Sequence, residues 1–186
     1  MLLMCATSSA QMKWNQSYQT YINQYKDLAI EQMLRYRIPA SITLAQGLFE
    51  SRAGQSDLVR QGNNHFGIKC HNWTGPTQYH DDDARGECFR VYQDAKESYE
   101  DHSRFLAKQP RYSRLFSLNT TDYKGWAHGL KSCGYATNPQ YANKLIQIIE
   151  LYRLQDYDKA KSYDRFMATH SGTDVPINAE GTLHPI

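Results

Sequence analysis

The sequence predicts a mainly α-helical fold with one small β-hairpin lobe. Over most of the chain, apolar residues recur at spacings of three and four, which is typical of amphipathic helices. Only residues 73–92 combine turn residues with short strand-like pieces. The 186 residues, 40% of them hydrophobic, suffice for one domain with its own core. We expect that domain to cover residues 11–157.

The first third of the chain predicts three helices. The first covers residues 16–37. The second begins at Pro39, because the missing N–H of proline costs nothing in a first helical turn, and it carries Glu50 near its end. Gly54 breaks the pattern, and a short helix is expected over residues 55–60. The apolar faces are formed by Tyr18, Ile22, Tyr25, Ala29, Met33 and Tyr36 in the first helix, and by Ile42, Leu44, Ala45, Leu48 and Phe49 in the second.

The hairpin and three further helices follow. Residues 65–69 are expected to be extended, and the two strands of the hairpin are expected at 77–79 and 88–92, with turn residues between them. Helices are expected over residues 96–108, ended by Pro110, over residues 122–133, capped by Asp122 and ended by Gly134, and from Asn138 and Pro139 onward.

Glu50 is the strongest candidate for chemistry. It ends an otherwise apolar helix, next to Phe49. Partial desolvation beside an apolar core favours the protonated carboxyl near neutral pH, which the general acid of a glycosidase needs. The alternative is an ordinary glutamate at a helix end, held in a salt bridge. Small or polar residues share its side of the helix and would admit a large substrate, namely Gln46, Gly47, Ala53 and Gly54.

Six segments carry a resemblance to a known family. They are LAQGLFES, NNHFGIKC, HNWTG, FRVYQDAKESYEDHSRFL, RYSRLF and GYATNPQYANKLIQIIE. In this order they resemble the glucosaminidase domains of glycoside hydrolase family 73, bacterial enzymes that cut the glycan strands of peptidoglycan. The resemblance runs from about Tyr18 to Tyr157. It implies a lysozyme-like body, a substrate cleft flanked by the hairpin lobe, and Glu50 as the catalytic acid on the floor of that cleft.

The resemblance implies an exported peptidoglycan hydrolase that cleaves the β-1,4 bond after N-acetylglucosamine. We expect a monomer whose partner is the glycan strand and which needs no cofactor and no metal. The alternatives are an N-acetylmuramidase of the same fold and a non-catalytic glycan-binding domain. The net charge of +2 is too small to indicate nucleic acid. No apolar run approaches the ~20 residues of a membrane span.

A second group usually complements the acid in glycoside hydrolysis. The resemblance implies that Tyr135 faces the cleft near Glu50, where its hydroxyl could hold the N-acetyl group or the water. Asp82, from the aspartate run of the hairpin lobe, is the candidate carboxylate, and a solvated turn is the alternative reading of that run. Inversion, retention assisted by the N-acetyl group and nucleophilic retention all stay open. The other carboxylates of this lobe are Asp81, Asp83 and Glu87.

Six further residues are expected to contact the sugar. Aromatic side chains offer an apolar face to a pyranose ring and, in tyrosine, a hydroxyl to its edge. Trp73 could equally cap the core of the hairpin. The six are Gln46, Asn63, Asn64, Phe66, Trp73 and Tyr141.

Cys70 and Cys88 bracket the predicted hairpin, so we expect a disulfide between them. Such a bridge would contribute ~3 kcal/mol and is typical of exported proteins. Cys133 is expected to remain unpaired. The alternative is zinc held by Cys70, His71, His80 and Cys88, whose spacing matches no standard zinc pattern.

Both ends of the chain are expected to lie outside the catalytic domain. Residues 1–10 are apolar and then small, which is typical of the end of a signal peptide cleaved before Gln11. This indicates the periplasm, the cell surface or the exterior as the place of action. Residues 158–186 are small, polar and proline-containing, which is typical of a linker or of an arm lying on the domain.

Overall fold

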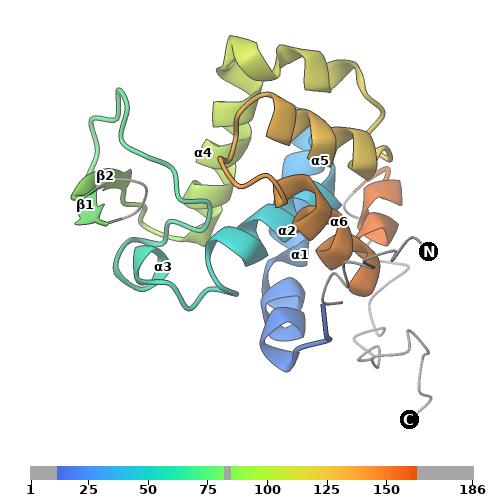
Figure 1. The fold of residues 1–186 in the computed structure, drawn as a ribbon, viewed down its shortest axis with the longest axis horizontal. Coiled ribbons are helices and arrows are strands. Elements are labelled where there is room, and N and C mark those ends of the chain that lie inside the picture. The colour runs from blue at the N-terminus through green and yellow to red at the C-terminus, as the bar shows by residue number, and fades with distance from the viewer. Residues whose placement is uncertain (1–11, 82–84, 163–186) are drawn as a thin grey trace, which may run out of the picture.

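Helix α2 (Ala40–Glu50) lies at the centre of the molecule in the computed structural model, which describes residues 12–81 and 85–162 (Figure 1). Its residues from Ala40 to Leu48 are all buried. The elements packed against it are α1 (Gln16–Tyr36), α5 (Tyr123–Ser132), α6 (Tyr141–Leu151) and the 3-10 helix η2 (Leu154–Lys159). The predicted fold class, a helical body with a small two-stranded lobe, is confirmed.

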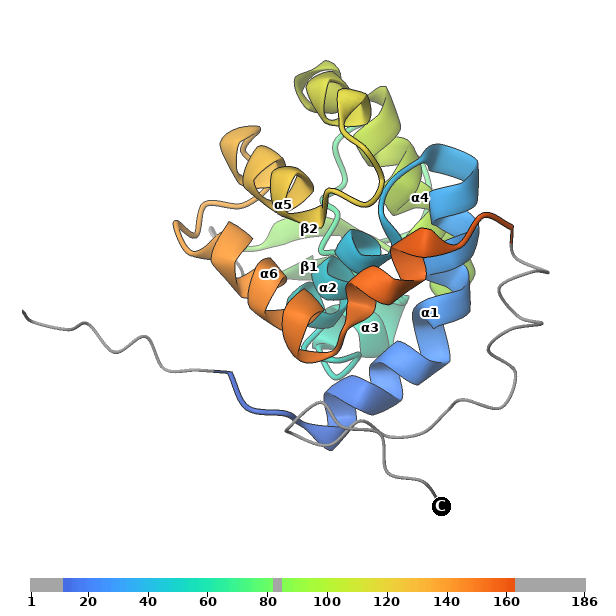
Figure 2. The same cartoon turned by 90° about the vertical axis from the view of Figure 1, so that its right-hand side faces the viewer.

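The first turn of α2 is stabilised by a residue far along the chain, Asp158. Pro39 has an extended ψ of 133° and stands before the helix rather than in its first turn. The carboxylate of Asp158 accepts hydrogen bonds from Ser41 N at 2.8 Å and from Ser41 Oγ at 2.6 Å. Asp158 therefore satisfies a donor that every helix leaves unpaired in its first turn. Figure 2 shows η2, which carries Asp158, crossing α2 on this side of the molecule.

The end of α2 is a left-handed turn. Arg52, Ala53 and Gly54 have φ values of 51°, 56° and 78° in succession. Side chains with a Cβ adopt this conformation at a cost, so the turn is held by hydrogen bonds, among them Ala53 N to Leu48 O at 2.9 Å and Gly54 N to Ser51 Oγ at 2.8 Å. The chain thereby leaves the helix immediately after Glu50.

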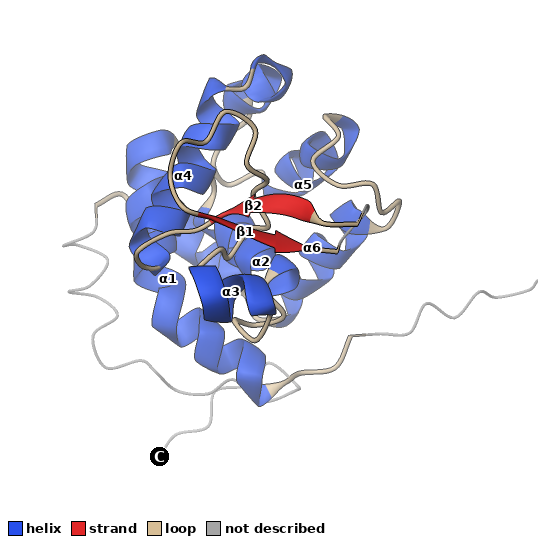
Figure 3. Ribbon diagram, turned by 90° about the vertical axis from the view of Figure 1, so that its left-hand side faces the viewer, coloured by secondary structure: helices blue, strands red, loops and turns tan. Residues whose placement is uncertain are grey.

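The hairpin lobe comprises α3 (Asp57–Gly62), β1 (Thr77–His80) and β2 (Glu87–Arg90) (Figure 3). The strands are antiparallel, with Thr77 opposite Arg90 and His80 opposite Glu87. A disulfide joins Cys70 to Cys88, whose Cα atoms are 5.4 Å apart.

The extended segment predicted over 65–69 is wrong in its first half. His65 and Phe66 form a turn, and only Lys69 pairs with the sheet, opposite Phe89. The reason is the side chain of Asn64, which accepts from Ile68 N and donates to Ile68 O, both at 3.0 Å. This ring of hydrogen bonds stabilises a turn in place of a strand.

The remaining helices are α4 (Ala95–Lys108), the 3-10 helix η1 (Pro110–Ser117), α5 and α6. Pro110 ends α4 as predicted, but it also begins η1, which the periodicity did not reveal. Helix α6 begins at Tyr141 and not at Pro139, because Asn138 Oδ1 accepts from Gln140 N at 2.8 Å and forms a separate turn.

The predicted boundaries at the two ends are only partly covered by the described residues. Asp158, where the C-terminal arm was expected to begin, is buried inside η2 and belongs to the helical body. The signal segment over residues 1–10 and the rest of the arm, residues 163–186, lie outside the described residues.

Candidate active site

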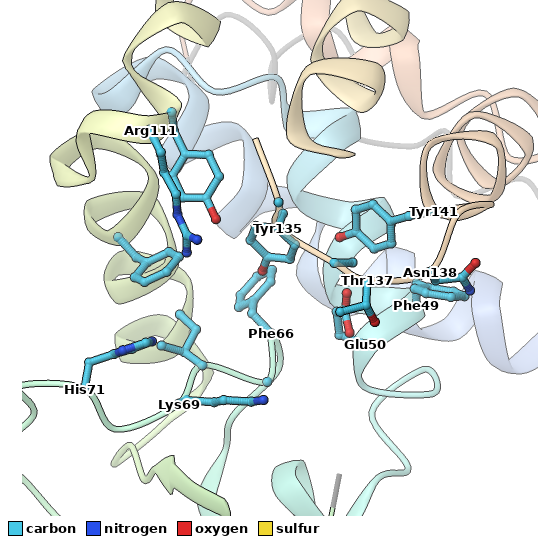
Figure 4. A pocket seen from close by; sticks show the side chains of 16 residues that line it. Phe49, Glu50, Phe66, Lys69, His71, Arg111, Tyr135, Thr137, Asn138 and Tyr141 are labelled. Atoms are coloured by element: carbon cyan, nitrogen blue, oxygen red, sulfur yellow. The ribbon is translucent and has the colours of Figure 1, made fainter. Parts of the chain in front are cut away.

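A cavity of about 400 Å³ opens between the helical body and the hairpin lobe (Figure 4). Glu50 and Phe49 reach it from the end of α2, and the loop after α3 supplies the side facing the lobe. The loop between α5 and α6 forms a further wall. The lining residues are Phe49, Glu50, Phe66, Gly67, Ile68, Lys69, His71, Phe105, Arg111, Tyr112, Gly134, Tyr135, Ala136, Thr137, Asn138 and Tyr141.

Glu50 is half-buried in this cavity. Among the lining residues that the structure describes it is the one carboxylate. Its neighbour Phe49 also lines the cavity and packs its ring edge against Tyr141, with ring centroids 5.9 Å apart. An acid in these surroundings is partly screened from water by aromatic rings.

The buried side chains of Gln46 and Tyr141 hold Glu50 in place from inside the protein. Gln46 Nε2 donates to Tyr141 Oη at 3.0 Å, inside the protein. Burial raises the pKa of Tyr141 well above its usual value, and both the charge of Glu50 and a hydrogen bond to Glu50 act in the same direction. The Tyr141 hydroxyl therefore keeps its proton and can donate it toward the carboxylate.

Tyr135 stands beside this pair in the cavity wall. Its ring stacks on that of Tyr141, with centroids 5.8 Å apart and an angle of 22° between the planes. Burial raises the pKa of the Tyr135 hydroxyl well above its usual value, and the nearby charge of Glu50 raises it further. The hydroxyl is thus a hydrogen-bond donor at neutral pH, within the electrostatic reach of Glu50.

The loop that carries Tyr135 is anchored to α5. Gly134, with φ of 78°, turns the chain after the helix, a conformation that glycine adopts without strain. Lys131 Nζ then donates to Ala136 O at 3.1 Å and to Thr137 O at 3.0 Å. These bonds hold the loop between α5 and α6 against the end of the helix.

His102, which the sequence places on the apolar face of α4, lies directly behind the cavity. It is fully buried, stacks on Phe66 at 3.9 Å between ring centroids, and meets Tyr135 edge-on at 6.2 Å. Burial lowers the pKa of His102 to about 3, so its ring is neutral. Sequence analysis did not assign it to the site, since periodicity marks it only as a buried position.

The side of the cavity away from Glu50 is basic. Figure 4 shows Lys69, His71 and Arg111 on this side. Lys69 Nζ pairs with Glu87 Oε1 of β2 at 2.7 Å. The pKa of His71 is lowered, first by partial burial and then by the neighbouring cations Arg90, Arg111 and Lys69. Lys69 and Arg111 were not singled out from the sequence, because isolated basic residues in loops carry no pattern, and His71 was considered there only as a ligand of the zinc alternative.

Four of the predicted site residues line this cavity together, namely Glu50, Phe66, Tyr135 and Tyr141. It places three others away from the cavity. Gln46 is fully buried, Asn64 bonds the backbone of Ile68 and Arg90, and Asn63 donates to Tyr92 O and Gln93 O. These three amides do not line the cavity in this structure, and their contact with sugar remains a prediction.

Two further predicted residues stand apart. Trp73 donates from Nε1 to Pro76 O at 2.9 Å and carries the Arg90 guanidinium over its ring at 5.1 Å, so it caps the hairpin instead of lining the cavity. Asp82 lies outside the described residues, as does Asp83. Asp81 is described, and its Oδ1 accepts from Gly86 N at 2.8 Å in the turn of the hairpin.

Among the described residues, no group of three or more His, Cys, Asp or Glu side chains could hold a metal ion. The zinc alternative also fails on its ligands, since the sulfurs of Cys70 and Cys88 are joined to each other. Cys133 is the free cysteine of the described part of the chain, and its Sγ accepts from Arg114 Nε at 3.2 Å. No helix over residues 12–81 and 85–162 is long and apolar enough to cross a membrane.

Comparison with known proteins gives a family and several relatives. The family model described as glucosaminidase, mannosyl-glycoprotein endo-beta-N-acetylglucosaminidase, matches residues 26–154. The chain is 35% identical over 136 residues to the exo-glucosaminidase LytG of Bacillus subtilis, covering 67% of this chain and 48% of that protein. It is 32% identical over 139 residues to the peptidoglycan hydrolase FlgJ of Salmonella typhimurium, covering 68% and 43%.

A solved structure agrees with these matches. The catalytic domain of the autolysin Auto from Listeria monocytogenes superposes with a TM-score of 0.65 at 30% identity, over 80% of this chain and 91% of that domain. The chain spans about half the length of the curated relatives it matches.

Proposed function

The chain belongs to the glucosaminidase family, and from this premise we propose that it hydrolyses the β-1,4 bond after N-acetylglucosamine in peptidoglycan, with Glu50 as the general acid. The observation that carries the proposal is the position of Glu50. This acid lies on the wall of a cavity that is otherwise rich in aromatic rings and tyrosine hydroxyls. Such rings suit the faces of pyranose sugars.

The proposed reaction uses both oxygens of Glu50. The hydrogen bond from Tyr141 holds the carboxyl group in place, and Gln46 holds Tyr141. The proton of Glu50 passes to the glycosidic oxygen as the bond from that oxygen to the anomeric carbon breaks. If the N-acetyl oxygen displaces the leaving group first, a water molecule then supplies a hydroxyl to the anomeric carbon and its remaining proton restores Glu50. If the water attacks directly, its proton passes to a base on the opposite face of the sugar, for which Asp82 is the proposed group.

Tyr135 supplies the complementary group in this proposal. Its protonated hydroxyl lies in the cavity wall near Glu50, where it can donate to the oxygen of the N-acetyl group or to the water. Either contact would orient the oxygen that attacks the anomeric carbon. Asp82 remains the proposed carboxylate of the hairpin lobe and lies outside the described residues.

Export and a catalytic domain over residues 11–157, acting as a monomer, belong to the same proposal. The disulfide between Cys70 and Cys88 supports export, because such bonds persist in oxidising compartments and are rare in the cytosol. The named activities of LytG and FlgJ support a wall substrate.

Mass spectrometry of the reducing ends released from purified peptidoglycan tests the bond specificity. We expect N-acetylglucosamine at the new reducing ends. N-acetylmuramic acid there would make the protein a muramidase, and no new ends at all would support a binding domain without activity.

Glu50→Gln tests the acid, because it removes the proton and keeps the shape of the side chain. The loss of activity should be ~10²–10⁴-fold. Glu150→Gln is the matched control and should retain activity. It neutralises an exposed glutamate of α6 that pairs with Lys124 of α5. More than a tenth of normal activity in Glu50→Gln would remove Glu50 from the role.

A further inference from the structure

We propose that the Arg111 side of the cavity binds a carboxylate of the peptide that is attached to the glycan strand. The inference rests on the proposed function, since it names the part of a peptidoglycan strand that the far end of the same cavity receives. It adds a specificity-determining site to a cavity whose catalytic end is Glu50.

The cavity is electrically polarised along its length. Glu50 lies at one side, and Arg111 and His71 lie at the other, with Phe66 and Tyr135 between Arg111 and Glu50 (Figure 4). Lys69 lies below Phe66 and extends from the side of His71 toward the middle of the cavity. An anionic group attached to the substrate would bind at the basic side, clear of the like-charged Glu50.

Arg111 is the basic residue of this side whose charge remains available. Lys69 pairs with Glu87 at 2.7 Å, and the neighbouring Arg90 pairs with Asp101 at 2.8 Å. Over the described part of the chain, no carboxylate forms an ion pair with Arg111, and its side chain is exposed.

Arg111 is nevertheless held in position. Its guanidinium lies 4.8 Å from the centre of the Tyr112 ring, and Tyr112 is itself fully buried at the start of η1. The attraction between the cation and the ring, together with a hydrogen bond to the Tyr112 side chain, restrains the guanidinium, which has further N–H donors to offer a ligand. A planar donor of fixed orientation suits a carboxylate, which it can hold through two parallel hydrogen bonds.

The chemistry of the strand supplies that carboxylate. N-acetylglucosamine is uncharged, whereas the neighbouring muramic acid residue carries a lactyl ether to which a peptide with free carboxylates is attached. A strand bound with a glycosidic oxygen at Glu50 therefore brings an acidic substituent into the region beside the reacting sugars. Arg111 would favour a peptide-bearing strand over a bare one.

The test removes the charge from each partner in turn. The substrates are purified strands freed of phosphate polymers, and the same strands after carbodiimide coupling of their carboxylates to ammonia. On native strands, Arg111→Gln should lower kcat/KM about fivefold to tenfold, mainly through KM. On amidated strands it should match the wild type. Arg111→Lys, which keeps the charge but not the two parallel donors, should recover only part of the loss on native strands.

Arg60→Gln, which removes an exposed arginine of α3 that does not line the cavity, is the matched control and should behave as the wild type on both substrates. An equal loss for Arg111→Gln on native and amidated strands would mean a structural role and overturn the proposal. Wild-type kinetics for Arg111→Gln on native strands would overturn it as well.

Co-sedimentation with the insoluble strands separates this inference from the proposed function. The Glu50→Gln variant should sediment with native strands. The double variant Glu50→Gln, Arg111→Gln should bind native strands more weakly than this single variant, and the two should bind amidated strands equally well. If the wild type released no reducing ends while this difference persisted, the proposed hydrolysis would fail and the carboxylate site would stand. If hydrolysis occurred as proposed and the difference were absent, the carboxylate site alone would fail.

Discussion

Gln46 Nε2 donates a hydrogen bond of 3.0 Å to Tyr141 Oη, so a buried amide of α2 fixes the tyrosine that is bonded to Glu50. Gln46 and Glu50 are one helical turn apart on the same helix, and Tyr141 comes from the first residue of α6. The junction of α2 and α6 thereby sets the direction of the proposed catalytic acid.

Tyr141→Phe should lower kcat about tenfold, because Glu50 loses the donor that orients it and the Gln46 amide loses its acceptor. Stability should fall by about 1 kcal/mol in urea unfolding for the same reason. Tyr152→Phe is the matched control, since its hydroxyl accepts from Asn15 N at 2.8 Å, away from the cavity. It should reduce stability and leave kcat unchanged. Equal kcat values in the two variants would separate Tyr141 from the chemistry.

Tyr135→Phe should lower kcat sharply with little change in stability, because only one hydroxyl is lost from a half-buried ring. Steady-state kinetics on soluble strands, together with thermal unfolding, would measure the two effects. Asp82→Asn should cause a smaller loss. If both variants stayed near wild-type activity, neither residue would be the second group, and Asp81, Asp83 and Glu87 would be tested next.

Local pattern was sufficient to place Glu50. Apolar residues at helical spacing defined α2, and the turn that follows Glu50 was visible as Gly54 and its polar neighbours. The same kind of signal located α1, α4 and α5 to within two residues. These features depend on contacts within one element, which a single sequence records directly.

The roles of the polar side chains were less accessible. Gln46 was expected to face substrate, but α6 covers that side of α2 and buries it. Asn64 was expected to contact sugar, yet it holds the turn between residues 64 and 68. Both outcomes depend on segments far apart in sequence or on side-chain turns that have no periodicity. Arg111 was missed for the same reason, since the cavity that it lines is assembled from segments far apart in the sequence.

Cys70 and Cys88 should be bridged in protein purified without reductant, as they are in the structure. Thiol labelling of unreduced, denatured protein that lacks Cys5 should find one reactive cysteine, Cys133. Replacing both bridged residues by serine should reduce the free energy of unfolding by ~3 kcal/mol, given the 18-residue separation that the bridge closes. Three labelled thiols would contradict the assignment.

His102 should make the protein less stable in acid. Its ordinary pKa of 6.5 is lowered to about 3 by burial, and within the described residues neither ring nitrogen has a hydrogen-bond partner. The unfolded chain therefore binds a proton between about pH 6.5 and 3 that the folded chain does not. The free energy of unfolding consequently falls as the pH decreases through this window and is fully retained above it.

His102→Phe removes this proton and keeps the stacking on Phe66. The free energy of unfolding measured in urea at pH 7.5 should change by no more than about 1 kcal/mol. The change is small because the substitution also removes two buried nitrogens that lack hydrogen-bond partners. Between pH 7.5 and 4.5 the variant should lose about 2–3 kcal/mol less than the wild type. Burial also lowers the pKa of His65 to about 4 and raises that of Asp158 to about 7, but both groups are present in the two proteins, so their contributions cancel in this difference. His128→Phe, at an exposed position of α5, controls for the loss of one histidine, and equal pH slopes in wild type and His102→Phe would refute the assignment.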